Sequence, residues 1–545
     1  MGETQDLTYD QTYDAIILGA GHNGLILQTY LAKAGLSTLS VERRETPGGG
    51  LAALEDPRHP GLFHNTHAFF LRAITTMPWY RDLDLEGHGA RMIEPELNVA
   101  MLTGDGGALE WWTDIERTVA SFAAISDRDA ATLKRWFEEF GPVVEHILIP
   151  EATTPPIPPA ERRALLEKSP EGRRLLEVSA LSPLEFVHQE FDSPVIKAGL
   201  LFFNGLREVD LRIKGFGHHI AFLLANPAKA QMSAGGSVAL GCALADAARA
   251  AGGEIATGTT PKRLIVEGGR VTGVETTDGR RLGARHLVAS SLNPQQTFLG
   301  LIDDDLLPAD WRRKAEAFRY NLLAPLFALN LTLSEPPRYA AADRRAELAQ
   351  PFMTILGLDH VDQFDDIVAH HEAGTIPPTV MWGTCPTQFD ASQSQDGKHT
   401  AFMWEKLPYA LDGDPANWDA AKDAHGEDML DLWARHAPNL KDAVLDRFTR
   451  SPLDVERDFP NMQAGDLLIG AFSDGQIGYH RPFEGAGDYR TCFEGLYLCG
   501  SASHPGGNIT GLPGYNAAQT IFHDLGLCGD WIPLPAAQRI AELAG

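Results

Sequence analysis

The feature that most constrains this chain is a glycine-rich turn between an apolar strand and a helix. Residues 15–18 are an apolar run typical of a buried strand, and glycines follow at Gly19, Gly21 and Gly24. This G-x-G-x-x-G spacing permits a tight turn, close approach of a phosphate, and close packing of helix on strand. The amides and the positive end of the helix then face an anion. The segment therefore predicts a βαβ unit that binds a dinucleotide.

The second strand of this unit is predicted to end at Glu42. A carboxylate there accepts hydrogen bonds from two ribose hydroxyls and repels a 2′-phosphate. Arg43 and Arg44 favour the opposite, because arginines in this position can bind a 2′-phosphate. The glycine run that follows includes Gly49 and Gly50, and it lets backbone pass close to a bulky ligand. The run resembles the Gly-Gly turn that lies beside FAD in flavoproteins of the glutathione-reductase superfold, and this resemblance favours a flavin over a nicotinamide.

Three separated blocks resemble the phytoene desaturase-like FAD-dependent oxidoreductases, in particular the pyridine nucleotide-disulfide oxidoreductase domain protein 2-like branch. They are Gly-Ala-Gly-His-Asn-Gly-Leu at 19–25 with the glycine run at 48–50, the middle segment 235–294, and the glycine-rich motif at 495–518. The resemblance implies an α/β fold, with an FAD-binding Rossmann-like domain of the glutathione-reductase type and an interleaved α+β substrate domain.

A chain of 545 residues exceeds a single ordinary core, so two domains are expected. The predicted boundaries are 12–75, 230–300 and 465–530 for the FAD-binding domain, 76–229 and 301–464 for the substrate domain, and 531–545 for a C-terminal tail. The middle piece of the first domain is predicted to be a helix followed by a β-meander. Glycines at 104–107 predict a hairpin turn and not a second dinucleotide site, so no separate NAD(P)H domain is expected.

The resemblance also implies which residues contact FAD. These are Gly19, Gly21, Gly24, Glu42, Arg43, Gly49, Gly50, Gly500, Gly511, Leu512, Pro513 and Asn516. Pro513 suits the first turn of a helix, whose dipole would stabilise the charge that develops on the flavin. One departure from the family pattern is Pro261, which takes the place of a valine whose backbone brackets the adenine. Proline has no N–H to donate there.

The candidate catalytic side chains lie in the two segments that the family's geometry brings near the flavin, 63–70 and 503–516. They are His67, His504 and Tyr515, and histidine is a suitable base near neutral pH. The alternative is that these side chains only pack around the cofactor. The sequence has no H-x-x-x-H or Cys/His pattern, so no metal is expected.

Composition limits the partners and the location. A net charge of −27 argues against nucleic acid and against electrostatic capture by anionic lipid. Five cysteines without a C-x-x-C pair indicate a reducing compartment, and the polar N-terminus is unlike a signal peptide, so a cytoplasmic protein is expected. Residues 195–226 are apolar and leave three interpretations open: core helices, a substrate tunnel, or peripheral contact at the inner face of a membrane. A homo- or hetero-oligomer stays open too.

For function, the resemblance implies hydride removal from a C–H bond of a hydrophobic substrate, either isoprenoid or terpene-like or alicyclic. The outcome would be desaturation or allylic oxidation. Without an NAD(P)H domain, the electrons would pass to oxygen, a quinone or a protein acceptor. Two alternatives are a flavin-dependent double-bond isomerase without net redox change and a non-catalytic FAD-binding partner subunit.

Overall fold

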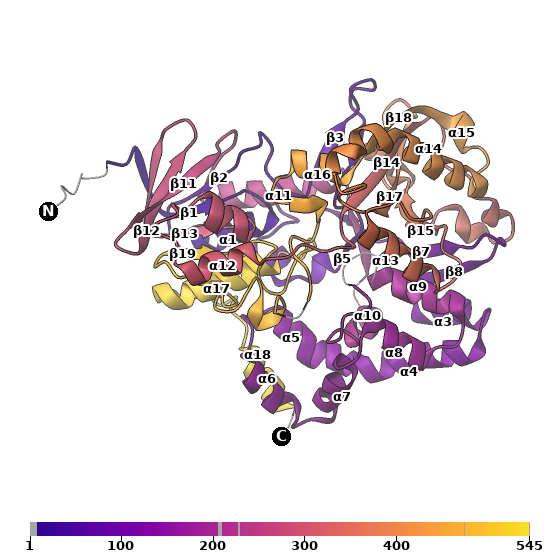
Figure 1. Cartoon of the computed structure of the whole chain (residues 1–545), viewed down its shortest axis with the longest axis horizontal. Coiled ribbons are helices and arrows are strands. Elements are labelled where there is room, and N and C mark those ends of the chain that lie inside the picture. Colours follow the sequence, from indigo (N-terminus) through magenta and orange to yellow (C-terminus); the bar gives the residue numbers. More distant parts are fainter. Residues whose placement is uncertain (1–7, 205–209, 227–228, 474, 544–545) are drawn as a thin grey trace.

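The computed structural model describes residues 8–204, 210–226, 229–473 and 475–543. Two seven-stranded sheets organise this part of the chain, one toward each end of the longest axis (Figure 1). A layer of helices lies beneath the second sheet in the same view. A single cavity is lined by residues from all three parts.

The first sheet combines a parallel core with an antiparallel meander. Its order is β10 (Glu254–Ala256), β2 (Thr38–Val41), β1 (Gln11–Leu18), β13 (Arg281–Ser290), β12 (Arg270–Thr276) and β11 (Pro261–Glu267), with β19 (Leu496–Leu498) also paired to β13. The pairs among β10, β2, β1, β13 and β19 are parallel, and those among β11, β12 and β13 are antiparallel. The strands therefore come from three distant stretches of sequence.

Both faces of β1 are buried over residues 15–18, which explains why this half of the strand is a continuous apolar run. Ala15 and Ile17 pack in the core that holds α1 (His22–Lys33), α11 (Ser237–Ala250) and α17 (Leu512–Leu525). Ile16 and Leu18 face the opposite core, which includes the meander and α12 (Ala309–Glu316). Successive side chains of a strand point to opposite faces, so one short run anchors both layers.

The second sheet is almost entirely antiparallel. Its order is β18 (Val444–Arg450), β14 (Leu326–Leu333), β17 (His399–Lys406), β16 (Met381–Thr384), β15 (Met353–Leu356), β7 (Leu97–Leu102) and β8 (Ala108–Trp112), and only β15 and β7 pair in parallel. Strands β7 and β8 form a hairpin, which confirms the turn predicted at 104–107. One face of the sheet packs on α14 (Trp418–His436), and the other faces the helical layer.

The helical layer follows β8 in sequence. It consists of α3 (Ile115–Ala123), α4 (Asp127–Val143), α5 (Ile149–Ala152), α6 (Pro159–Leu166), α7 (Pro170–Ser179), α8 (Pro183–Glu190), α9 (Pro194–Asn204) and α10 (His218–Ala225). The apolar stretch 195–226 supplies α9 and α10, whose Ile196, Leu200 and Ile220 are completely buried, so its described part contributes core helices. Residues 205–209 of that stretch lie outside the described part.

Shorter elements connect these layers. They are β3 (Ala53–Glu55), β4 (Phe63–Asn65), β5 (Leu71–Arg72), β6 (Met92–Ile93), β9 (Ala230–Ser233), α2 (Pro78–Asp82), α13 (Gln363–Ala373), α15 (Leu440–Ala443), α16 (Pro452–Asp458) and α18 (Ala536–Glu542). Within the segment 63–70, only residues 63–65 form a strand, β4, which pairs with β3.

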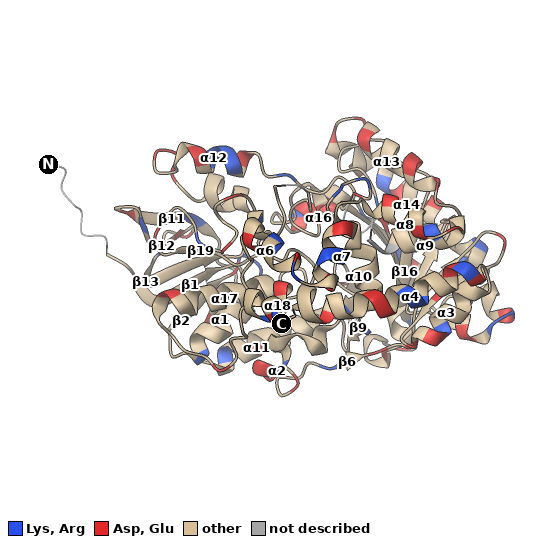
Figure 2. Ribbon diagram, turned by 90° about the horizontal axis from the view of Figure 1, so that it is seen from below, with Lys and Arg blue, Asp and Glu red and all other residues tan. Residues whose placement is uncertain are grey.

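Acidic and basic residues are intermingled along the outer helices (Figure 2). Several form ion pairs, such as Arg135 with Glu139 on α4 and Lys314 with Asp310 on α12. Within the described residues, no helix combines the length and the apolar character needed to cross a membrane.

Candidate cofactor and substrate cavity

A continuous cavity of about 920 Å³ connects the glycine-rich turn with the second sheet. At one end it is lined by the turn after β1, by the end of β2 and by the loop 505–512. At the other end it is lined by α10 and by β7, β8, β15, β16 and β17 of the second sheet. Ligands of open α/β sheets bind outside the carboxyl ends of the strands, which is where the first end of this cavity lies.

The glycine turn has the close contacts that its spacing predicts. Gly19 has φ +91°, and a Cβ on Gly24 would lie 2.3 Å from the carbonyl oxygen of Gly19. Gly21 has open space instead, because a Cβ there would meet only the Cα of Gly49, at 3.7 Å. Helix α1 begins directly after Gly21, with no side chain capping its first amides. Gly19, Gly21 and Gly24 all line the cavity, and the arrangement fits a phosphate group.

Glu42 lies in the cavity wall at the end of β2 and also fixes the turn. Its carboxylate accepts hydrogen bonds from the backbone N–H of Ala20 and of Arg44, both at 2.9 Å. Each carboxylate oxygen has two lone pairs, so acceptor capacity remains for hydroxyl groups. The Arg43 guanidinium donates to the Asp458 carbonyl, and Arg44 stacks 4.4 Å above the Phe459 ring.

The C-terminal motif supplies a second helix N-terminus beside the cavity. Helix α17 starts after Gly511, whose φ of +67° and tight contact with Ile26 leave no room for a side chain. Leu512 lines the cavity. The other residues predicted in this motif do not line the cavity directly; they are Gly500, Gly511, Pro513 and Asn516. Asn516 holds the motif against α5, donating to the Ala152 carbonyl at 2.9 Å.

Two of the three candidate catalytic residues also lie behind the cavity lining. Nε2 of His504 donates to the Glu151 carbonyl at 2.8 Å, and burial lowers the pKa of this histidine to about 4. The Tyr515 hydroxyl donates to the Trp531 carbonyl at 3.1 Å. Both side chains bond to backbone carbonyls and do not line the cavity. Their contact with a substrate stays a prediction, and this arrangement does not support it.

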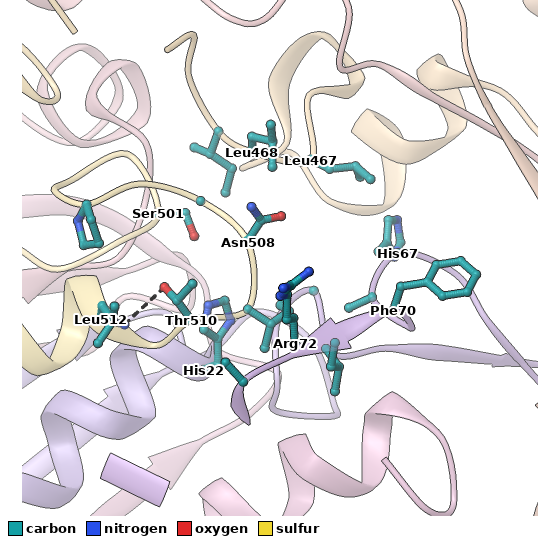
Figure 3. A pocket seen from close by; sticks show the side chains of 18 of the residues that line it. His22, His67, Phe70, Arg72, Leu467, Leu468, Ser501, Asn508, Thr510 and Leu512 are labelled. Carbon is teal, nitrogen blue, oxygen red and sulfur yellow. Dashed lines mark hydrogen bonds between the residues drawn. The ribbon is translucent and has the colours of Figure 1, made fainter. Parts of the chain in front are cut away.

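His67 lies in the cavity wall, beside Phe70 in Figure 3. Its Nδ1 is 2.7 Å from the Thr66 hydroxyl, whereas its Nε2 is buried without a hydrogen-bond partner. Burial, reinforced by the positive charges of Arg450 and Arg44, holds the pKa of His67 well below its usual value. The imidazole is therefore neutral near pH 7 and has one nitrogen free for a ligand.

The far end of the cavity is an aromatic wall, formed by Phe69, Phe70, Phe352, Trp382 and Trp404. The rings of Phe70 and Trp404 meet edge to face with centroids 5.7 Å apart, and Phe70 meets Phe352 at 5.2 Å. Trp404 faces the cavity because alternate residues of β17 share one face of the sheet. This wall suits an apolar ligand.

Comparison with known proteins agrees with this geometry. Residues 17–83 match the NAD(P)-binding Rossmann-like domain family. A limonene dehydrogenase subunit of Castellaniella defragrans is 30% identical over 534 residues, which cover 94% of this chain and 95% of that protein. The chain belongs to the phytoene desaturase-like family of FAD-dependent oxidoreductases.

Two further relatives of this desaturase-like oxidoreductase are informative. Pyridine nucleotide-disulfide oxidoreductase domain-containing protein 2 of Rattus norvegicus is 29% identical over 557 residues, covering 94% of both chains. The solved structure of an oxidoreductase from Methanosarcina mazei has a TM-score of 0.60 at 15% identity, covering 93% of this chain and 99% of that one. The latter likeness supports the fold alone.

Several cavity-lining residues of this oxidoreductase were not predicted as site residues, among them His22, Arg72, Ser501 and Asn508. His22 is inside the glycine motif, and Ser501 and Asn508 are inside the C-terminal motif, so proximity to the glycines was the available signal. No sequence signal pointed to Arg72, because its position in the cavity wall depends on contacts with residues distant in the sequence. Its guanidinium donates to the carbonyls of Leu223 and Asn226, which join β5 to the end of α10.

A cluster outside the cavity was also not apparent from sequence patterns. Asp56, His59 and Asp446 offer ligand atoms within 4.8 Å of one another, a spacing that could hold a metal ion. However, Arg58 forms an ion pair with Asp446, and Lys398 lies 3.2 Å from Nδ1 of His59. These two cations already balance the cluster's negative charge.

Proposed function

We propose that this chain binds FAD along the first part of the cavity and removes a hydride from a C–H bond of a hydrophobic substrate held against the aromatic wall. The product would be a new C=C bond or an allylically oxidised compound. The electrons would then leave to oxygen, a quinone or a protein acceptor. The observation that carries the proposal is the continuity of one cavity from the glycine turn to the aromatic wall.

The first part of the cavity supports the cofactor assignment. Gly21 and the uncapped start of α1 would hold the pyrophosphate, and Glu42 would accept from the ribose hydroxyls. Pro261 and Thr260 line the same end, so an adenine there would lack a backbone donor at position 261. When bound, FAD supplies the two-electron acceptor, while the protein supplies orientation and electrostatics.

The second part supports a hydrophobic substrate. Its wall is dominated by aromatic rings and aliphatic side chains, including those of α10. Such a wall excludes water, which protects a carbon centre from which hydride is being removed. The related limonene dehydrogenase subunit is named for a cyclic terpene, so a terpene or another alicyclic compound is the first substrate class to test.

His67 is the residue placed best to handle a proton. Its neutral imidazole has an unpaired nitrogen in the cavity wall, which is the form that accepts a proton from a substrate. The Thr66 hydroxyl holds the other nitrogen and fixes the ring. We expect His67→Ala to slow substrate oxidation while FAD stays bound.

The test is anaerobic rapid mixing of purified protein with candidate cyclic terpenes and isoprenoids, followed at the flavin absorbance. Substrate-dependent bleaching supports net dehydrogenation, and it should be slower in His67→Ala than in a matched His360→Ala control, since His360 is exposed on the surface. Bleaching at the parent rate in His67→Ala would remove His67 from the mechanism. Purified protein with no affinity for FAD would refute the whole proposal.

Two other outcomes of the same experiment identify the alternatives. Substrate turnover with the flavin oxidised at completion would indicate a double-bond isomerase. Bound FAD that neither substrates nor artificial acceptors can cycle would indicate a partner subunit, which is worth testing because the relative from Castellaniella defragrans is named as one subunit of a dehydrogenase. Size-exclusion chromatography with light scattering would then report whether the chain assembles with copies of itself.

A further inference from the structure

His22 is a buried histidine at the N-terminus of α1, inside the glycine motif and in the cavity wall. Only 7% of its surface is exposed, and its Nε2 has no hydrogen-bond partner. In Figure 3 the ring lies between Thr510 and Arg72, to the left of the Arg72 side chain. A buried polar atom without a partner is costly, so a ligand group that pairs with it would be stabilised.

The protonation of this ring decides which ligand group can pair with it. Burial lowers the pKa of His22 to about 4, opposed only by a hydrogen bond to the Asn508 backbone, so the ring is neutral at pH 7. A backbone group that raises the pKa of a histidine is a carbonyl, which accepts the ring proton. Because Nε2 has no hydrogen-bond partner, we assign the bond to the Asn508 backbone to Nδ1. Nε2 of His22 therefore carries a lone pair.

This assignment excludes the pyrophosphate as the partner of Nε2, and the hydroxyls of the adenosine ribose are already assigned to Glu42, so the donors that remain are those of the flavin half. Pyrophosphate oxygens are acceptors only and cannot pair with a lone pair, whereas the hydroxyls of a ribityl chain and a ring N–H are donors. The amides at the start of α1 remain available for the pyrophosphate. Two neighbouring parts of the same turn thus offer opposite hydrogen-bonding character.

We propose that Nε2 of His22 accepts a hydrogen bond from a donor on the flavin half of the cofactor, and that it positions this half without contacting the pyrophosphate. The inference rests on the proposed binding of FAD. In this role His22 binds the cofactor, and the Asn508 carbonyl fixes the tautomer of its ring.

The experiment measures the equilibrium binding of two ligands, FAD and ADP, to flavin-free protein. ADP lacks the flavin half and serves as the reference. In His22→Phe, which keeps a ring but removes the acceptor, we expect the Kd for FAD to rise about 10-fold, the effect of one hydrogen bond. The Kd for ADP should stay as in the parent. His22→Gln restores an acceptor and should recover part of the affinity, and His360→Phe is the matched surface control.

The outcomes separate the two proposals. Parent protein that binds ADP but not FAD would refute the assignment of the cofactor. Parent protein that binds FAD with the same Kd as His22→Phe would refute only the role of His22. Equal losses for FAD and ADP in His22→Phe would also overturn it, because the side chain would then act on the ADP portion that the two ligands share. Retained ADP binding shows that the variant is folded.

Discussion

Replacing Gly24 by alanine tests whether close packing of α1 on the glycine turn is needed to bind the cofactor. The added Cβ would lie 2.3 Å from the Gly19 carbonyl oxygen and 3.2 Å from Cγ2 of Ile17, whereas real Cβ contacts are essentially never below 3.0 Å. The first contact is with backbone, so no side-chain rotation relieves it. The helix and the turn must separate, and the amides at the start of α1 move with the helix.

The expected magnitude follows from the hydrogen bonds that this shift breaks. A hydrogen bond to a charged group is worth about 1.5–3 kcal/mol, so losing one amide–phosphate bond weakens binding by about 10- to 150-fold. The assay is titration of flavin-free protein with FAD, monitored by quenching of flavin fluorescence.

Gly141→Ala is the matched control for Gly24→Ala. Gly141 lies inside α4, and a Cβ there meets nothing within 4 Å. This substitution should leave the Kd for FAD unchanged and slightly favour the helix. A Gly24→Ala protein that binds FAD within twofold of the parent would refute the argument from close packing.

Three further predictions follow from the same cavity. Glu42→Arg should release FAD, because the acceptor for the ribose hydroxyls is replaced by a cation that cannot accept from the Ala20 amide. The exposed control Glu45→Arg should retain FAD, and flavin content after gel filtration decides between the two results. Trp404→Leu should raise the Kd for a hydrophobic substrate without changing that for FAD, and a parallel loss of both would show that the aromatic wall is not a separate subsite. Burial lowers the pKa values of His22 and His504 to about 4, so between pH 6.5 and 4 the unfolded chain binds more protons than the folded one, and stability falls as the pH drops through this range. Flavin-free protein should therefore melt at a lower temperature at pH 5 than at pH 7. An unchanged melting temperature would contradict the buried neutral state.

Local sequence was sufficient for the βαβ unit at the start of the chain. The apolar run of β1, the three glycines and Glu42 are close in sequence, and their geometry depends on neighbours within about one supersecondary unit. The same holds for the hairpin of β7 and β8 and for helix α17, which begins at Leu512 next to the predicted Pro513. In each case a turn or a capping residue has a fixed offset from the element that it begins or ends.

The catalytic side chains could not be placed in this way. His504 and Tyr515 are within a motif that resembles the family's flavin motif, yet they turn away from the cavity to donate to the carbonyls of Glu151 and Trp531. Those partners come from α5 and from the segment after α17, and no periodicity in the sequence connects them. Which way a side chain points depends on the packing of distant elements.

The sequence alone determined the dinucleotide-binding turn, because phosphate binding by backbone amides needs glycines at fixed spacing. The family and its flavin-linked chemistry followed from the resemblance of three sequence blocks to known oxidoreductases. Only the tertiary structure decided what faces the reacting space. It joined the turn to an aromatic wall built from β16, β17 and the residues directly before β5 and β15, left Nε2 of both His22 and His67 unpaired, and buried the other candidates. The physical reason is that a cavity is bounded by residues hundreds of positions apart, and their meeting is fixed by the packing of whole layers.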